Sequence, residues 1–549
     1  MPRPGSRDRS LYFDYPRYEF VRPPELDGRR ITHDVAIVGA GPVGLAAALE
    51  LARHGVSSVL LDDKGTLNDG SRAICIARHS LEILQQLGVS ERFVGKALGW
   101  THGTSYYGTR PVYRLEMPHS THERFHPMYN LQQQYVELFL AEAALEEPRI
   151  DLRWLSRVTG IEVTGEGARL AIATAAGPYT LATRYVIAAD GARSVVRHEL
   201  GLALKGDAYE GCYVIADIRM QSQYPTERRA YFNSPGNPDS TVLLHRQPDD
   251  IWRVDYQLTS GESETDALQE GNVRRRVGAI LEMVGEQAPW ELEWWSLYKA
   301  YTLALDDYRH GPVLFAGDAA HLVPIFGVRG LNSGLADAMN AAWKLAYVCR
   351  GRAPPRLLDS YSPERRGATL EIFDLAAKST KFMTPPTRGY RLLRDAALAL
   401  SLRHDLARPL INPRQSQPYT YSASPLTSFA GRDRDFASGP AAGAPLVNRR
   451  LEHGSFLLDA LGRGFSGLSF SPDGKLPAEL AALAPRLATG DEAFTVINVR
   501  DRDAAAAYGA ADGGFYLVRP DRHVAARWRT MAPDEITSAW RRALGWSAA

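Results

Sequence analysis

The amino-acid sequence predicts an α/β protein in which a dinucleotide-binding domain is interrupted by an antiparallel β-sheet and followed by a smaller α/β unit. Three observations predict this class. A glycine-rich turn joins two apolar runs within residues 34–62. Alternating apolar and aromatic runs, separated by turn residues, fill 206–299. Strand-like and helix-like stretches recur between 446 and 549.

The composition of the chain restricts the classes of function that we expect. The 549 residues suffice for several domains, and a net charge of +1 gives no electrostatic reason to expect nucleic acid or an anionic membrane as a partner. The three cysteines, Cys75, Cys212 and Cys349, lie far apart and lack metal-ligand spacing, so we expect neither a metal site nor a disulfide framework. Because the chain also lacks a secretory signal and a long apolar run, we expect a cytoplasmic protein without a membrane span.

Residues 1–33 form a polar extension before the first predicted strand. Disordered tails are usually poor in aromatic residues. This extension instead carries five aromatic residues within nine positions, namely Tyr12, Phe13, Tyr15, Tyr18 and Phe20. We therefore predict that it wraps around the body of the protein.

The glycine-rich turn has the features of a phosphate-binding turn. The apolar run 35–38 is typical of a buried parallel strand. Gly39, Gly41 and Gly44 then follow as G-x-G-x-x-G. The first glycine permits the tight turn, the second lets a pyrophosphate approach the backbone, and the third lets the next helix pack closely.

The residues after the turn complete a Rossmann-like pattern. A helix is predicted to about His54, and its N-terminus would offer a partial positive charge to a phosphate. The strand 59–61 follows, and Asp62 stands near the offset expected for the acid that holds a ribose hydroxyl. The pattern therefore predicts a dinucleotide site but does not distinguish FAD from NAD(P). A glycine-rich turn in an ordinary α/β domain is the alternative.

Two further stretches place polar residues at strand ends. Asp190 and Gly191 follow the apolar run 185–189, and Gly317 and Asp318 follow 313–316. Ligands of open α/β sheets bind at the carboxyl ends of their strands, which makes both acids candidate ligand residues.

The second acidic turn leads into an irregular loop and a long helix. The proline- and glycine-rich segment 321–330 predicts a loop, and a helix is predicted from Asn332 to about Cys349. His321 could relay a proton from this loop, or it could cap the loop in a structural role. Arg72, in an earlier loop, could face cofactor phosphates or lie on the surface.

The sheet predicted at 206–299 is a candidate substrate domain, because ligand cavities often form where two domains meet. Arg246, Tyr256 and Tyr298 are its candidate substrate residues, with simple packing as the alternative for each. The nucleotide domain would then comprise 34–205 and 300–400. Residues 401–445 contain several prolines and predict a linker before the unit at 446–549.

Three motifs stand in one order and support a family resemblance. They are GAGPVG at 39–44, DGARSVVR at 190–197 and GDAAHLVPIFGVRGLNSGLADAMNAAWKLA at 317–346. Together they resemble the single-component FAD-dependent aromatic hydroxylases, a family that includes phenol hydroxylase and 3-(3-hydroxyphenyl)propionate hydroxylase. The resemblance covers about 34–400. Residues 446–549 resemble the thioredoxin-like C-terminal domain of the phenol hydroxylase branch. They contain no C-x-x-C motif, so we do not expect a redox-active thioredoxin.

The resemblance implies a set of FAD contacts. Asp62 would hold the adenosine ribose, Asp318 the ribityl chain, and the N-terminus of the helix from Asn332 would face the flavin. The cofactor-binding residues implied are Gly39, Gly41, Gly44, Asp62, Arg72, Gln133, Asp190, Gly191, Asp318, Gly330, Leu331 and Asn332. We assign catalytic roles to His321, Pro324 and Arg329, which lie in the loop between Asp318 and the helix from Asn332.

The loop departs from the family pattern P-P-x-x-G-Q-G-M-N. Arg329 stands where the family has Gln, and Ile325 replaces the second Pro. The additional positive charge could favour an anionic substrate or the reduced flavin, or it could point to solvent.

The resemblance also implies an activity. NAD(P)H would reduce FAD, O₂ would form a flavin C4a-hydroperoxide, and one oxygen atom would pass to a small phenolic substrate. The choice between NADPH and NADH stays open, as does a homodimer with contacts through the N-terminal arm and the C-terminal unit. A flavin-dependent oxidase or other FAD oxidoreductase without hydroxylation, and an NAD(P)-dependent dehydrogenase, are the alternatives.

Overall fold

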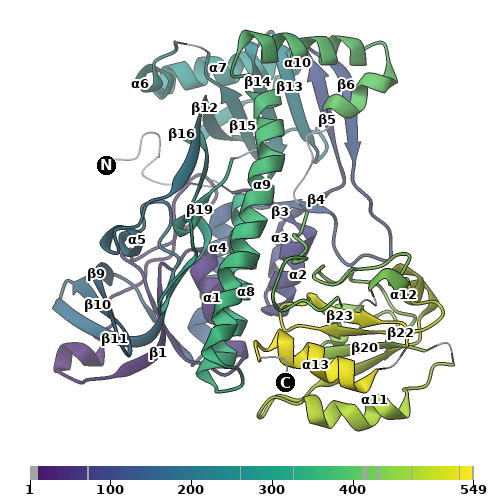
Figure 1. Cartoon of the computed structure of the whole chain (residues 1–549). Coiled ribbons are helices and arrows are strands. Elements are labelled where there is room, and N and C mark those ends of the chain that lie inside the picture. Colours follow the sequence, from purple (N-terminus) through teal and green to yellow (C-terminus); the bar gives the residue numbers. More distant parts are fainter. Residues whose placement is uncertain are drawn as a thin grey trace.

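The computed structural model describes residues 10–70, 73–259, 261–324, 327–411, 417–429, 433–471, 473–530 and 532–546. Its described elements build a nucleotide-binding sheet with helices, a second large sheet above it, and a smaller C-terminal sheet beside the long central helices (Figure 1). Among the described helices, none is both long enough and apolar enough to cross a membrane.

The nucleotide-binding sheet has a parallel centre. Its main strand order is β17-β18-β11-β1-β2-β8, and β9 and β10 form an antiparallel extension of β11. The strands are β1 (Thr32–Val38), β2 (Ser58–Leu61), β8 (Ile150–Arg153), β9 (Arg157–Thr164), β10 (Gly167–Thr174), β11 (Gly177–Ala188), β17 (Arg309–His310) and β18 (Val313–Phe315).

The predicted strand, turn, helix and strand are confirmed. The end of β1 is buried from Val35 to Val38, as a parallel strand covered on both faces should be. Helix α1 (Pro42–Arg53) follows, and Gly55, with φ of 78°, ends it in the left-handed conformation that favours glycine. Helix α1 packs against α8 (Gly330–Cys349), which begins two residues before the predicted start.

The second large sheet is antiparallel except for one strand pair. Its order is β19-β16-β12-β15-β14-β13-β5-β6, with β13 and β5 parallel. The strands are β5 (His102–Tyr107), β6 (Arg110–Glu116), β12 (Lys205–Met220), β13 (Arg228–Ser234), β14 (Asn237–Arg246), β15 (Ile251–Gln257), β16 (Trp290–Ala304) and β19 (His321–Leu322). Strands from outside 206–299 thus complete the sheet, and two residues of the predicted loop form β19.

Helices cover both faces of this sheet in part. Helix α7 (Glu270–Met283) packs its apolar residues on one face, together with α6 (Glu264–Ala267). The long helix α9 (Tyr361–Met383) rises from the nucleotide domain to the sheet, and α10 (Arg388–Ser401) lies across the top in the view of Figure 1. The remaining part of the second face is turned toward the nucleotide domain.

Shorter elements connect these layers. A small antiparallel sheet has the order β3-β7-β4. Its strands and the neighbouring helices are β3 (Cys75–Ala77), β4 (Leu98–Trp100), β7 (Met128–Asn130), α2 (Arg78–Gln86), α3 (Ser90–Lys96), α4 (Gln133–Glu146) and α5 (Val195–Glu199).

The C-terminal unit contains a mixed sheet with the order β21-β20-β22-β23. Its elements are β20 (Ser466–Phe470), β21 (Thr495–Val499), β22 (Gly514–Val518), β23 (Val524–Trp528), α11 (Ala478–Leu483), α12 (Arg502–Ala507) and α13 (Pro533–Ala543). The strands β21, β22 and β23 agree with the prediction, whereas the central strand β20, rich in Ser and Gly, was not predicted. The likeness of the whole C-terminal unit to thioredoxin stays a proposal.

Part of the predicted linker is packed. Tyr421 is 2% exposed, and Leu426 belongs to the main hydrophobic core. The segment 417–429 is therefore anchored by buried residues, although other residues of it are exposed, and it joins the C-terminal unit to the central helices.

The N-terminal arm wraps around the body, as predicted, over its described residues. Tyr18 stacks on Trp154 with ring centroids 4.4 Å apart, and Phe13 is buried. The Tyr15 hydroxyl accepts a hydrogen bond of 2.9 Å from Gln134.

Candidate functional site

The glycine-rich turn has a geometry that its glycines require. A Cβ at Gly44 would lie 1.9 Å from the Gly39 carbonyl oxygen, and one at Gly39 would lie 2.5 Å from that of Ala189. At Gly41 a Cβ would meet nothing within 4 Å. The turn is therefore closed at Gly39 and Gly44 and open above Gly41, which leaves room for a pyrophosphate against the backbone and the N-terminus of α1.

Asp62 ties the end of β2 to this turn. Its carboxylate accepts hydrogen bonds from the backbone N–H groups of Ala40, at 2.7 Å, and Lys64, at 3.0 Å. Burial raises its pKa above the ordinary value. A carboxylate offers about four acceptor positions, so these two bonds leave capacity for a ribose hydroxyl.

Asp190 and Gly191 follow β11 at the same edge of the sheet. Gly191 has φ of 76°, and the Asp190 carboxylate accepts a hydrogen bond of 3.1 Å from the Val196 N–H at the start of α5. Arg197 in α5 donates to the Ala319 carbonyl at 3.0 Å. The segments of the two acidic turns are therefore joined through Arg197, which also donates to the Ala192 carbonyl.

The turn after β18 presents Asp318 outward. Asp318 is exposed, although Gly317 and Ala319 beside it are buried. Beneath it, the Asp337 carboxylate accepts hydrogen bonds from the Gly317 N–H, at 3.0 Å, and from His321 Nε2, at 2.7 Å. We call residues 317–321 the GD loop.

His321 is fully buried in this arrangement. Its ring stacks on Tyr308 with centroids 5.8 Å apart, and its Nε2 is hydrogen-bonded to the Asp337 carboxylate. This contact supports the structural alternative for His321, in which the imidazole fixes the GD loop, over a proton relay.

The N-terminus of α8 is fixed by Asn332. Its amide oxygen accepts from the Ala77 N–H at 2.9 Å, and its amide nitrogen donates to the carbonyls of Cys75, at 3.2 Å, and Val328, at 2.7 Å. Gly330 and Leu331 are half-buried in the first turn. Val328 has φ of 60°, which is strained for a β-branched residue and often marks a functional loop.

Arg329 does not point to solvent, which excludes one of its predicted placements. The residue is 2% exposed, and its guanidinium donates to the Ile372 carbonyl of α9 at 3.0 Å. Burial lowers its pKa to about 10. Pro324 is also buried, beside the Val323 carbonyl that accepts a hydrogen bond of 2.9 Å from Tyr298. Ile325 lies outside the described residues.

Gln133 joins α4 to the loop that precedes β3. Its side chain accepts from the Ala73 N–H at 3.3 Å and donates to Glu137 at 2.7 Å. Glu137 also accepts two hydrogen bonds from Asn68, and burial raises its pKa to about 7. Arg72, which belongs to the same loop, lies outside the described residues.

Two predicted substrate residues lie on the far face of the sheet. Tyr256 is 1% exposed and packs in the cluster formed with α7, and Arg246 donates to the Tyr224 carbonyl on that same side. Successive side chains of a strand point to opposite faces, so neither residue reaches the face turned toward the nucleotide domain. This placement does not support substrate contacts of Arg246 and Tyr256, which stay predictions. Tyr298 differs from them, because its hydroxyl donates to the Val323 carbonyl, just after the GD loop.

The other face carries polar residues that the sequence analysis did not select. We call this set the polar face: Asp217, Arg228, His245, Arg253 and Asp255. Arg253 forms a buried bidentate pair with Asp217, with bonds of 2.9 and 2.8 Å. The alternation of Trp252, Arg253, Val254 and Asp255 in β15 was the signal that could have found Arg253 and Asp255.

Two atoms of the polar face are buried without a hydrogen bond from the described residues. They are Asp255 Oδ1 and His245 Nδ1. Burial, with a smaller effect of Asp217, raises the pKa of Asp255 to about 7, and burial lowers the pKa of His245. Unsatisfied buried polar atoms call for an explanation, and a bound ligand provides one.

The polar face lies close to the N-terminus of α8. The Cys75 thiol is within electrostatic reach of Arg228, Arg253 and Asp255, and the Cys75 carbonyl accepts from Asn332. The Cys75 thiol also donates to Asn130, which in turn donates to the Arg246 carbonyl at the end of β14. One site therefore combines a nucleotide turn, two acidic turns, a helix N-terminus and a buried polar surface.

These features define the class of a dinucleotide-binding protein with an adjoining ligand face. The model of the family described as FAD binding domain matches residues 32–376, and the chain belongs to this family. The closed and open positions of the glycine-rich turn fit the FAD pyrophosphate. FAD is thus the cofactor that the chain takes.

Curated relatives carry names of aromatic hydroxylases. The chain is 26% identical over 540 residues to a 3-(3-hydroxy-phenyl)propionate/3-hydroxycinnamic acid hydroxylase of Mycolicibacterium smegmatis, with 92% of each chain covered. It is 27% identical over 540 residues to a second such hydroxylase, from Burkholderia vietnamiensis, with coverage of 94% of this chain and 97% of the relative.

Solved structures share the fold. The flavin-dependent monooxygenase PieE in complex with FAD and substrate matches with a TM-score of 0.78 at 24% identity, covering 94% of this chain and 100% of the other. Aklavinone-11 hydroxylase with FAD and aklavinone matches with a TM-score of 0.74 at 22% identity and the same coverage. The prediction of a single-component FAD-dependent aromatic hydroxylase is thereby confirmed at the level of class and cofactor, and it is favoured over the oxidase and dehydrogenase alternatives.

Proposed function

We propose that the protein hydroxylates a phenolic ring that also carries an anionic group, with NAD(P)H as electron donor and O₂ as co-substrate. The observation that carries this proposal is the polar face: buried, partly unsatisfied side chains beside the N-terminus of α8. The names of the relatives support it, because hydroxyphenylpropionate and hydroxycinnamate join a phenol to a carboxylate.

The FAD-binding residues have distinct roles in this proposal. The backbone at Gly41 and the N-terminus of α1 take the pyrophosphate, Asp62 the adenosine ribose, and Asp318 the ribityl hydroxyls. When bound, FAD supplies the redox chemistry with O₂ that protein side chains lack. The first turn of α8, from Gly330, stabilises negative charge placed at its end.

Arg228 is the proposed anchor of the substrate anion. It is 7% exposed, and the described residues give it no hydrogen bond or ion pair. Burial lowers its pKa, and the nearby Cys75 and Asp255 offset this effect only in part. A carboxylate or phenolate from the substrate would satisfy this guanidinium with charge-assisted hydrogen bonds.

Asp255 is the proposed proton acceptor. Its Oδ1 is buried without a hydrogen bond, and its pKa of about 7 suits a group that takes a proton near neutral pH. A phenolic hydroxyl at this atom would become a better electron donor for attack on oxygen.

The test compares three ligands on the FAD-loaded protein under air: 3-(3-hydroxyphenyl)propionate, 3-phenylpropionate and 3-ethylphenol. We expect the first to stimulate NADPH or NADH oxidation and to give a hydroxylated product. Loss of either the phenol or the carboxylate should weaken both effects. Stimulated oxidation that yields only hydrogen peroxide with every ligand would favour the oxidase alternative.

A matched pair of variants tests the anchor. Arg228→Gln should raise the KM for 3-(3-hydroxyphenyl)propionate by about tenfold or more, because a charge-assisted hydrogen bond is worth roughly 1.5–3 kcal/mol. Arg246→Gln removes an arginine from the other face of the same sheet and should leave KM nearly unchanged. Equal effects in both variants would contradict the anchor.

We also propose a cytoplasmic location.

We propose a homodimer as well. Five leucines of the segment from α10 onward are strongly exposed: Leu392, Leu393, Leu400, Leu406 and Leu410. Such apolar patches often mark protein contacts. Light scattering of the wild type and of Leu392→Glu would test a dimer through this surface, and a monomeric wild type would exclude it.

A further inference from the structure

The C-terminal unit is joined to the central helices by a buried network of charges. In the turn between β22 and β23, Arg519 forms a bidentate pair with Glu364 of α9, with bonds of 2.6 and 2.9 Å. Glu364 also accepts from Lys344 of α8 at 2.7 Å. Arg519 is 1% exposed, so this pair is shielded from water. We call Arg519, Asp521 and His523 the latch.

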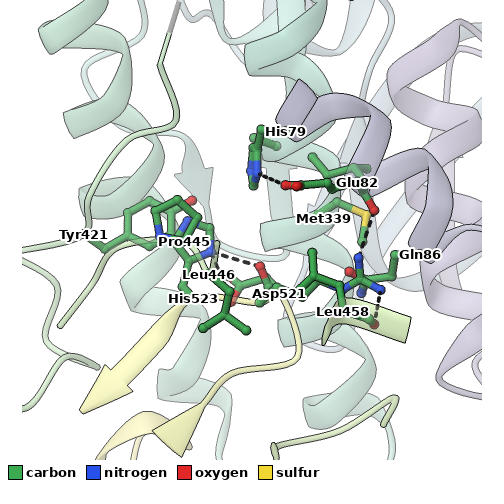
Figure 2. Close-up of a pocket in the computed structure, with 13 residues that line it drawn as sticks. His79, Glu82, Gln86, Met339, Tyr421, Pro445, Leu446, Leu458, Asp521 and His523 are labelled. Atoms are coloured by element: carbon green, nitrogen blue, oxygen red, sulfur yellow. Dashed lines mark hydrogen bonds and ion pairs between the residues drawn. The ribbon is translucent and has the colours of Figure 1, made fainter. Parts of the chain in front are cut away.

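Asp521 extends the network along α8. Its carboxylate accepts from Trp343 Nε1 at 3.1 Å and from the Asn340 amide at 3.4 Å. Asn340 also lies 3.3 Å from the Tyr421 hydroxyl, whose ring packs on His523 with centroids 4.4 Å apart. Figure 2 shows Tyr421, Asp521 and His523 around one small pocket at this interface.

The network continues from Tyr421 to the GD loop. The Tyr421 hydroxyl accepts from Arg365 Nη1 at 2.9 Å, and Arg365 Nε donates to Asp337 at 2.6 Å. Asp337 in turn holds the Gly317 N–H and His321. Burial opposes ionisation of Asp337, but Arg365 and His321 outweigh it and hold the pKa at about 2, so the carboxylate stays charged.

We infer that the latch of the C-terminal unit sets the position of the GD loop, and through it the affinity for FAD, with Tyr421 as a positioning residue. The inference rests on the proposed role of Asp318 and its loop in holding FAD. Each link is a buried hydrogen bond or ion pair, and removing one partner leaves the next charge less well satisfied. The C-terminal unit then influences the flavin site indirectly. In this network none of its residues contacts the GD loop.

A purely structural interface is the alternative, and a matched pair of variants separates the two. Tyr421→Phe removes the hydroxyl that joins Arg365 to Asn340 and keeps the ring. Tyr347→Phe removes another buried hydroxyl of the same interface, which donates to Glu492 of the C-terminal unit. Within the described residues, no hydrogen bond of Tyr347 leads to Asp337, so only Tyr421→Phe breaks the path to the GD loop.

The measurements are FAD dissociation constants by flavin fluorescence, thermal midpoints, and the flavin midpoint potential of the loaded protein. We expect both variants to lower the thermal midpoint by similar amounts. Tyr421→Phe should raise the FAD dissociation constant by about tenfold and shift the potential, because it weakens a charge-assisted bond. Tyr347→Phe should change neither property. An unchanged dissociation constant in Tyr421→Phe, or equal changes in both variants, would overturn the inference.

Two additional variants keep the result interpretable. Asp318→Asn tests the loop itself: an unchanged FAD affinity there would refute the proposed cofactor placement. A weakened affinity in Asp318→Asn with an unchanged one in Tyr421→Phe would refute the latch alone. If Tyr421→Phe does not fold, Asn340→Ala removes the amide that joins Asp521 to Tyr421, and the same two outcomes apply to it.

Discussion

The nucleotide turn and the polar face are two functional surfaces of the same molecule built in opposite ways. At the turn, consecutive residues from Gly39 to Gly44 act through their backbone, and Gly39 and Gly44 leave no room for a Cβ in the folded chain. On the polar face, side chains from β12, β13, β14 and β15 meet because strand register places them together. A local surface depends on a few neighbouring residues, whereas a surface made by register depends on the whole sheet.

The largest expected effect concerns the turn. Gly44→Ala should destroy FAD binding and strongly destabilise the fold, because its Cβ would lie 1.9 Å from a backbone oxygen. Gly41→Ala should fold with an unchanged thermal midpoint in the apoprotein, since nothing lies within 4 Å of its Cβ, yet bind FAD weakly. FAD content and thermal midpoints are measured for both variants. Normal FAD binding in Gly41→Ala would show that the pyrophosphate does not approach the backbone at Gly41.

An intermediate effect is expected on the polar face. The pKa of Asp255 is raised to about 7, so the stabilisation from its neutral form is complete below its ordinary pKa and is lost as pH rises through 7. The corresponding change in the free energy of unfolding is on the order of a few kcal/mol. Asp255→Asn cannot ionise, so its stability relative to wild type should increase between pH 4 and pH 8.

Urea unfolding at fixed FAD concentration measures this difference at each pH. A stability difference that stays constant from pH 4 to pH 8 would mean that Asp255 titrates normally. The polar face would then be more hydrated than its burial indicates.

The smallest expected effect distinguishes the two faces of the sheet. Tyr256→Phe removes a hydroxyl on the side of α7 and should change the KM for 3-(3-hydroxyphenyl)propionate by less than about twofold. Steady-state kinetics beside Arg228→Gln makes the comparison direct. A rise in KM as large as that of Arg228→Gln would place the substrate on the α7 face.

Much of the fold could be predicted because its signals are local. The strand and turn at 35–44, the acidic turns after β11 and β18, and the helix α8 each follow from a short pattern of apolar, glycine and polar residues. β20 was missed because Ser and Gly have low strand propensity, and only burial between β21 and β22 makes this segment a strand.

The sequence by itself determined the nucleotide turn, the order of the motifs and the family, because backbone geometry restricts which residues such turns accept. Only the tertiary structure decided which side chains reach the site. In the folded protein, Arg246 and Tyr256 lie on the α7 face of the sheet, whereas Arg228 and Asp255 lie together on the polar face. Arg329 is buried against α9, and Tyr421 is buried although it belongs to the predicted linker. The physical reason is that the face of a strand and the partner of a buried charge depend on residues distant in the chain, which pair only when the chain folds.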